Sequence, residues 1–78
     1  MENKYPDINI EATGEKIRKL MKAKRLDTYT LSQMLEMRST TSIYAWTQGR
    51  VLPNTTNLVR LAQIFDCKID DLIVMNEV

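Results

Sequence analysis

The sequence predicts an all-α domain built from five short helices, and three observations support this fold class. Apolar residues recur three and four positions apart in several segments, which is the spacing of one helical face. Side chains that cap helix N-termini precede most of these segments. The alternation of apolar and polar residues that is typical of strands is missing from the sequence. A chain of 78 residues has room for one such domain.

Residues 1–9 are expected to form a flexible N-terminal arm, and residues 10–78 the folded domain. Pro6 interrupts regular structure, and the residues around it are polar. Charged side chains in this segment exclude the apolar stretch of a secretion signal. Cys67 is the only cysteine of the sequence, so no disulfide can form within the chain. These features predict a cytoplasmic protein.

The first helix is expected over Ile10–Arg25, and either Asn9 or Thr13 can cap its N-terminus. Gly14 inside this helix costs about 1 kcal/mol relative to alanine. We therefore expect another stretch of backbone to pass close to Gly14. The apolar face of this helix consists of Ile17, Leu20 and Met21.

The second helix is expected over Thr28–Leu35, with Asp27 as its N-terminal cap. Residues 36–38 then form a turn, although no glycine marks it. The apolar side chains of this helix are Leu31, Met34 and Leu35.

The third helix begins after Ser39 or Thr40, either of which can cap it, and runs to Gln48. Gly49 follows directly, as is common for the residue that ends a helix. Ile43 and Trp46, three residues apart, lie on one face of this helix and are expected to enter the core.

Two more helices complete the domain. Asn54 caps a helix expected over Thr55–Phe65, and Asp66 ends it because aspartate tolerates the left-handed conformation. A short helix over Ile69–Val74 carries two aspartates in its first turn, where they suit the helix dipole. The apolar face of the longer helix consists of Leu58, Leu61, Ala62 and Phe65.

The composition excludes several classes of function. The sequence has no histidine, no cysteine cluster, no glycine-rich phosphate loop and no plausible pairing of a nucleophile with a base. We therefore expect no enzymatic activity, no metal, no cofactor and no small-molecule ligand. The apolar runs are too short to cross a membrane.

The charge is unevenly distributed although its net value is only +1. The segment from Lys16 to Arg50 is mainly basic, whereas the segment from Asp66 onward is mainly acidic. A basic face is typical of proteins that bind nucleic acids, although basic runs also occur as ordinary solvated helix surface.

Two short helices joined by a tight turn are typical of a helix-turn-helix, whose second helix enters the DNA major groove. Such a recognition helix needs an apolar inner face and small polar side chains on its outer face. Glutamine can pair with adenine, and threonine or alanine can contact the thymine methyl group. The outer face here carries Thr40, Thr41, Tyr44, Ala45 and Gln48.

These helices resemble the lambda-repressor and Cro type of transcription regulators, the XRE family. The series that carries the resemblance is Ile43-x-x-Trp46-x-x-Gly49-x-x-x-Pro53, then Asn57-Leu58, Leu61 and Asp70-x-Leu72. Further matches precede this series, starting at Gly14, so the resemblance covers about three quarters of the chain. It implies a compact five-helix lambda-repressor-like domain.

The resemblance also implies a function and its residues. The function is sequence-specific binding to a double-stranded DNA operator by a bacterial regulator, with a recognition helix at about residues 40–48. Such a protein resides in the cytoplasm and joins the nucleoid when bound to DNA. The residues expected to bind DNA are Thr28, Ser39, Thr40, Thr41, Tyr44, Ala45, Gln48, Arg50, Asn54 and Thr55.

Within this set, the resemblance assigns phosphate contacts to Thr28 and to the backbone N–H groups at the start of the fourth helix, residues 54–56. It places Gln48, Gly49 and Arg50 at the end of the recognition helix and in a loop that approaches the DNA backbone. Many such domains bind as dimers, so a homodimer is one expected assembly. Its surface would come from the arm or from residues 73–75.

The sequence departs from the family pattern at two places. Glu36 stands where the family commonly has glycine, and the turn is expected to be one residue longer, which leaves open whether Thr40 or Thr41 leads the base contacts. Met21 and Thr47 occupy the positions of an Arg–Glu pair, which we interpret as an apolar substitute for that link. An alternative function is an antitoxin-like or anti-regulator module that binds another protein, which the near-neutral charge slightly favours.

Overall fold

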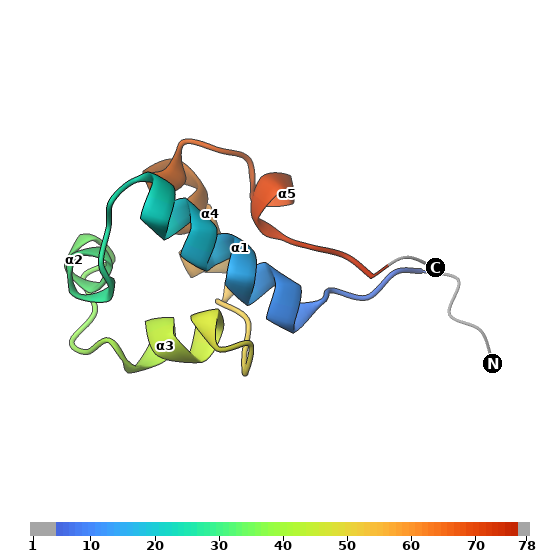
Figure 1. Cartoon of the computed structure of the whole chain (residues 1–78), viewed down its shortest axis with the longest axis horizontal. Helices are drawn as coiled ribbons and strands as arrows, with labels where there is room; N and C mark the ends of the chain where they lie inside the picture. Colours follow the sequence, from blue (N-terminus) through green and yellow to red (C-terminus); the bar gives the residue numbers. More distant parts are fainter. Residues whose placement is uncertain (1–4, 77–78) are drawn as a thin grey trace.

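The predicted all-α fold is confirmed, and a computed structural model describes residues 5–76 of the chain. Residues 1–4 of the predicted arm and residues 77–78 lie outside the described part. The helix ends differ from the predicted limits by one or two residues, as is common for frayed termini. The helices are α1 (Ile10–Ala23), α2 (Thr28–Met34), α3 (Thr41–Thr47), α4 (Thr55–Phe65) and α5 (Ile69–Leu72) (Figure 1).

Three of these helices begin with a side-chain cap, as predicted. In each, an Asn or Asp oxygen accepts a hydrogen bond from the backbone N–H three residues later, which satisfies a donor that the helix leaves open. Asn9, rather than Thr13, therefore caps α1. The bonds are Asn9 Oδ1 to Ala12 N at 2.9 Å, Asp27 Oδ1 to Thr30 N at 2.7 Å and Asn54 Oδ1 to Asn57 N at 2.8 Å.

The C-termini of the first four helices share one turn geometry. Each ends at a residue with a positive φ, and the next backbone N–H bonds to the carbonyl five residues earlier. Only one of these residues is a glycine, which explains why composition alone marks the turns poorly. The positive-φ residues are Arg25 at 55°, Glu36 at 56°, Gly49 at 73° and Asp66 at 55°.

The core lies where the five helices meet, and it matches most of the predicted apolar faces. Leu20 and Leu58 are only half-buried. Met34 is 50% exposed, so the prediction of a core position for it was wrong. Ser32 is buried instead, and its hydroxyl donates to the Tyr29 carbonyl at 2.6 Å. The buried apolar residues are Ile17, Met21, Leu31, Leu35, Ile43, Trp46, Leu61, Ala62, Phe65 and Leu72.

Helix α1 crosses the middle of the domain and packs directly on the C-terminal end of α3 (Figure 1). A Cβ atom added to Gly14 would lie closer than 3.0 Å to the Trp46 carbonyl oxygen. Gly49 also lies close to α1, because its own added Cβ would lie 2.9 Å from the Glu11 Cα. The expectation that another backbone passes close to Gly14 is therefore confirmed.

The two ends of the described chain run side by side away from the helices (Figure 1). Ile8 and Met75 form an antiparallel bridge, flanked by Asn9 N to Val74 O at 2.7 Å and Asn76 N to Asp7 O at 2.8 Å. The part of the predicted arm at residues 7–9 is thus held by the C-terminal segment. This pairing was missed because the segments are too short to show an alternating pattern.

The buried hydroxyl of Thr13 connects this terminal pair to α1. Thr13 Oγ1 accepts a hydrogen bond from Val74 N at 3.0 Å and lies 3.5 Å from Val74 O, to which it can donate. Its side chain is fully buried, and this partner satisfies it. Thr13 therefore has a structural role, because its hydroxyl joins α1 to the C-terminal segment.

Replacing Gly14 by alanine is expected to lower the free energy of unfolding by roughly 2 kcal/mol, because the new methyl group meets rigid backbone. Helix propensity alone predicts that this replacement raises the free energy of unfolding. Chemical denaturation measures the change, and Glu15→Ala on the exposed side of α1 is the control, with a shift within about 0.5 kcal/mol. Equal or greater stability for Gly14→Ala would contradict the close approach.

Replacing Glu36 by glycine is expected to raise the free energy of unfolding by roughly 0.5–1 kcal/mol, because glycine adopts a positive φ without steric cost. Glu36→Ala removes the same side chain but keeps the strain, so it should gain nothing. Denaturation curves of both variants separate these effects. The same stability change in both would show that φ is not the cause.

Candidate nucleic-acid interface

Helix α3 has one face in the core and one face in solvent. Ile43 is fully buried and only 4% of Trp46 is exposed, whereas 49% of Tyr44 is exposed. The core position predicted for Trp46 is confirmed. Burial of two large apolar side chains fixes the rotation of this seven-residue helix about its axis. The opposite face is thereby turned outward.

The outward face of α3 forms an open hollow of about 430 Å³. Half of the residues predicted to bind DNA line it together. Its walls combine a hydroxyl, an aromatic ring, a methyl group, an amide and a guanidinium. The lining residues are Thr41, Tyr44, Ala45, Gln48 and Arg50.

The remaining predicted residues lie at helix starts outside this hollow. Ser39 and Thr40 immediately precede α3, and Thr28 is the first residue of α2. Asn54 and Thr55 stand at the start of α4, where both are exposed. The Asn54 side chain caps the helix, where its oxygen accepts from Asn57 N.

Helix α3 begins at Thr41, and its first backbone hydrogen bond joins Tyr44 N to the Thr40 carbonyl oxygen at 3.1 Å. Thr40 takes the N-cap position without a side-chain bond, and Ser39 Oγ lies 3.5 Å from Thr41 N. Thr41 is exposed and lines the hollow, whereas Thr40 is half-buried. Of these two candidates for the leading contact, Thr41 has the more accessible side chain.

Arg18 makes a link between α1 and α3 that the sequence reasoning missed. Its guanidinium donates to the Thr47 carbonyl oxygen at 3.0 Å, at the C-terminal end of α3 where a cation suits the helix dipole. Met21, for which an apolar link was expected, lies in the core. The only hint of this contact in the sequence was that Met21 and Thr47 replace the Arg–Glu pair that links these helices in the family.

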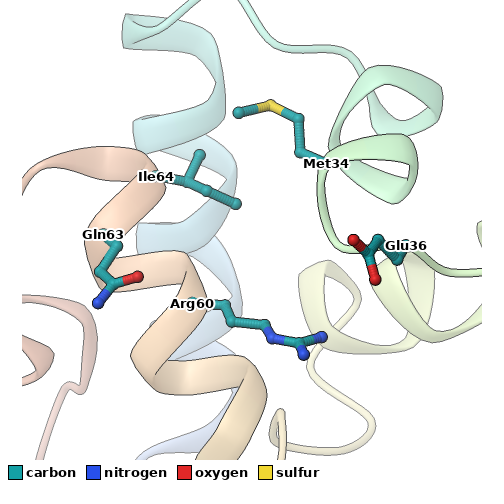
Figure 2. Close-up of a pocket in the computed structure, with 5 residues that line it drawn as sticks. All are labelled: Met34, Glu36, Arg60, Gln63 and Ile64. Atoms are coloured by element: carbon teal, nitrogen blue, oxygen red, sulfur yellow. The ribbon is translucent and has the colours of Figure 1, made fainter.

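A second hollow lies between α2 and α4 and contains none of the predicted residues (Figure 2). Arg60 extends from α4 toward the end of α2, and its guanidinium lies 3.5 Å from the Leu35 carbonyl oxygen. A cation at this helix end is favourable, so Arg60 braces the helix that precedes the turn. The lining residues are Met34, Glu36, Arg60, Gln63 and Ile64.

Asp27 sets the electrostatics at the start of α2. Hydrogen bonds from the backbone and side chain of Thr30 hold the pKa of the Asp27 carboxyl below its ordinary value of 3.8. The carboxylate is therefore charged at neutral pH beside Thr28. It stabilises the helix that positions the turn and α3.

The described residues give little support to a metal site or a membrane-spanning helix. Within residues 5–76, no group of three or more His, Cys, Asp or Glu side chains could hold a metal ion. Among the described helices, none combines the length and the apolar content needed to span a membrane.

The family model for the Cro/C1-type HTH DNA-binding domain matches residues 16–77. The fold is similar to that of the restriction-modification controller protein C.AhdI from Aeromonas hydrophila, with a TM-score of 0.72, 22% identity, and coverage of 81% of this chain and 94% of that chain. It is also similar to the DNA-binding domain of BldD, with a TM-score of 0.71, 15% identity, and coverage of 85% and 94%. No curated protein sequence matches.

The Asp27 cap predicts a pH dependence. Because the folded-state pKa is lowered, the stabilisation is present above pH 3.8 and is lost as the pH falls through the folded-state value. Asp27→Asn keeps a capping oxygen but cannot titrate. The Tm of the wild type should therefore fall relative to that of Asp27→Asn below pH 3.8 in thermal melts. A constant difference between the two across this range would contradict the assignment.

Proposed function

The chain belongs to the Cro/C1-type helix-turn-helix DNA-binding domain family, and we propose that it binds a specific double-stranded DNA sequence as a bacterial transcription regulator. The observation that carries this proposal is the hollow on the outward face of α3, lined by five of the predicted residues. In a helix-turn-helix this is the face that enters the major groove.

The residues of this face suit different parts of a base pair. The Thr41 hydroxyl can donate to or accept from a base edge, and the Ala45 methyl group can pack on thymine. Tyr44 is half exposed and offers an aromatic surface beside them. These short side chains support direct base recognition, which requires close approach of the helix.

Contacts to phosphate are assigned to the helix starts around this face. Thr28 begins α2 and contributes its hydroxyl group. Thr55 begins α4, where backbone N–H groups stand at the positive end of a helix dipole. Ser39 and Thr40 add hydroxyl groups directly before α3. Such contacts fix the position of a protein on the duplex and carry no base preference.

We also propose that the protein acts as a homodimer through its paired ends. The two surfaces considered from the sequence, the arm and residues 73–75, lie next to each other in the terminal pair. A hollow of about 350 Å³ here is lined by Ile8, Asp70, Ile73 and Met75. Met75 is 45% exposed and Tyr5 is 80% exposed, so two symmetric copies would cover apolar surface.

This proposal includes no enzymatic role and places the protein in the cytoplasm, on the nucleoid when DNA is bound. The alternative is a module that binds another protein. The exposed rings of Tyr29 and Tyr44 and the net charge of +1 favour this alternative. DNA selection discriminates between the two.

Repeated selection from a randomised duplex pool, followed by sequencing, is expected to recover a two-fold repeat with half-sites about 10 base pairs apart. Thr41→Ala should change the preferred base at one position. Thr28→Ala should instead weaken all sequences alike by a few-fold, since it affects phosphate contact. Titration of the recovered site at two salt concentrations measures both effects.

Three outcomes of this selection would count against the proposal. Recovery of no motif, with residual binding that vanishes at moderate salt, would favour the protein-binding module. A motif with a single half-site would contradict the homodimer alone. Equal effects of Thr41→Ala and Thr28→Ala on all sequences would contradict base recognition by the hollow.

A further inference from the structure

The last four carbonyl groups of α3 all accept hydrogen bonds, and one of these bonds comes from another helix. The end of an α-helix leaves such groups without partners inside the helix. The Thr47 oxygen, the last of the four, accepts from the Arg18 guanidinium of α1 at 3.0 Å, and no backbone N–H group of residues 5–76 reaches it. The turn after the helix supplies the other three bonds, which are Gln48 N to Tyr44 O at 2.9 Å, Gly49 N to Trp46 O at 3.0 Å and Arg50 N to Ala45 O at 3.0 Å.

The start of α3 has no comparable anchor. Thr40, its N-cap, makes no side-chain hydrogen bond to the helix, and Ser39 Oγ lies 3.5 Å from Thr41 N, which is a weak contact. Helices α1, α2 and α4 each begin with a side-chain cap instead. A helix of seven residues without such a cap depends on contacts from the rest of the domain.

Arg18 reaches the end of α3 because of its place on α1. Gly14 lies four residues earlier on the same face of α1, and it lets the helix backbone approach the Trp46 carbonyl oxygen. The next carbonyl, that of Thr47, is then within reach of the Arg18 side chain. A guanidinium here also suits the negative end of the helix dipole.

The Arg18 contact acts on a different part of α3 from the core side chains. Ile43 and Trp46 are buried, and their burial fixes the rotation of α3 about its axis. Arg18 is exposed, and its bond instead holds the last turn of α3 against α1. Gln48 directly follows this turn and lines the outward hollow. Base contacts depend on placement within roughly 0.5 Å, so an unanchored helix end would weaken them.

We infer that Arg18 is a positioning residue for DNA recognition. It holds the C-terminal turn of α3 in the orientation from which the outward face reads bases, and it acts through the Thr47 carbonyl rather than through DNA. This inference rests on the proposed DNA-binding function. Loss of the bond lowers affinity for the selected sequence, whereas binding to unrelated DNA, which depends on charge, falls only as for any lost exposed cation.

The test compares the wild type with Arg18→Met, Arg18→Lys and the matched control Lys22→Met. Lys22 is also exposed and lies one turn further along α1, so its replacement removes the same charge from the same helix. Each protein is titrated on the selected site and on an unrelated duplex at several salt concentrations. Thermal melts define a temperature at which every variant is folded.

Arg18→Met should lower the ratio of specific to non-specific affinity by roughly threefold to tenfold, the effect of one hydrogen bond. Lys22→Met should keep the ratio of the wild type. Arg18→Lys retains a cationic donor at the helix end and should restore part of the lost ratio. On the unrelated duplex, Arg18→Met and Lys22→Met should show the same salt dependence.

Each other outcome overturns the inference in a different way. If the wild type selects a motif and Arg18→Met keeps the ratio, with or without a lower Tm, Arg18 has no positioning role and DNA binding stands. If Arg18→Met weakens both duplexes alike and its salt slope falls by about one relative to Lys22→Met, Arg18 contacts phosphate instead. If Lys22→Met lowers the ratio equally, charge rather than the bond is responsible. If the wild type recovers no motif, the proposed function and this inference both fail.

Discussion

The packing of α1 against the C-terminal end of α3 is the contact on which the rest of the structure depends. Gly14 lets the α1 backbone approach the Trp46 carbonyl, and Gly49 approaches Glu11 from the other side. Arg18 adds a hydrogen bond to the last carbonyl of α3. A helix as short as α3 is unstable alone in water, so its orientation comes from this packing. The face of α3 that turns outward is therefore the face that does not pack against α1.

The terminal segments extend this arrangement. Thr13 lies on α1 one residue before Gly14, and its hydroxyl bonds to Val74 of the C-terminal segment. The same helix thus contacts both α3 and the end of the chain. Helix α3 and the proposed dimer surface are consequently both held by α1. In a symmetric dimer this connection would determine the distance between the two recognition helices.

The C-terminal end of α3 shows how a backbone turn can bring two side chains together. Gly49 ends the helix and returns the chain, and this return places Arg50 beside Gln48. Read singly, the two residues are polar side chains near one end of α3. Residue type therefore predicted that this end is polar, and the turn decided which polar side chains lie side by side.

The sequence by itself determined the features that depend on neighbours within a few residues. Helical periodicity and the caps at Asn9, Asp27 and Asn54 act over three or four positions, so all five helices and their order could be predicted. The tertiary structure alone decided which predicted site residues share a hollow, why Met34 is exposed, and that Thr13 meets Val74, 61 positions away. Such contacts depend on the path of the whole chain, and no local pattern encodes that path.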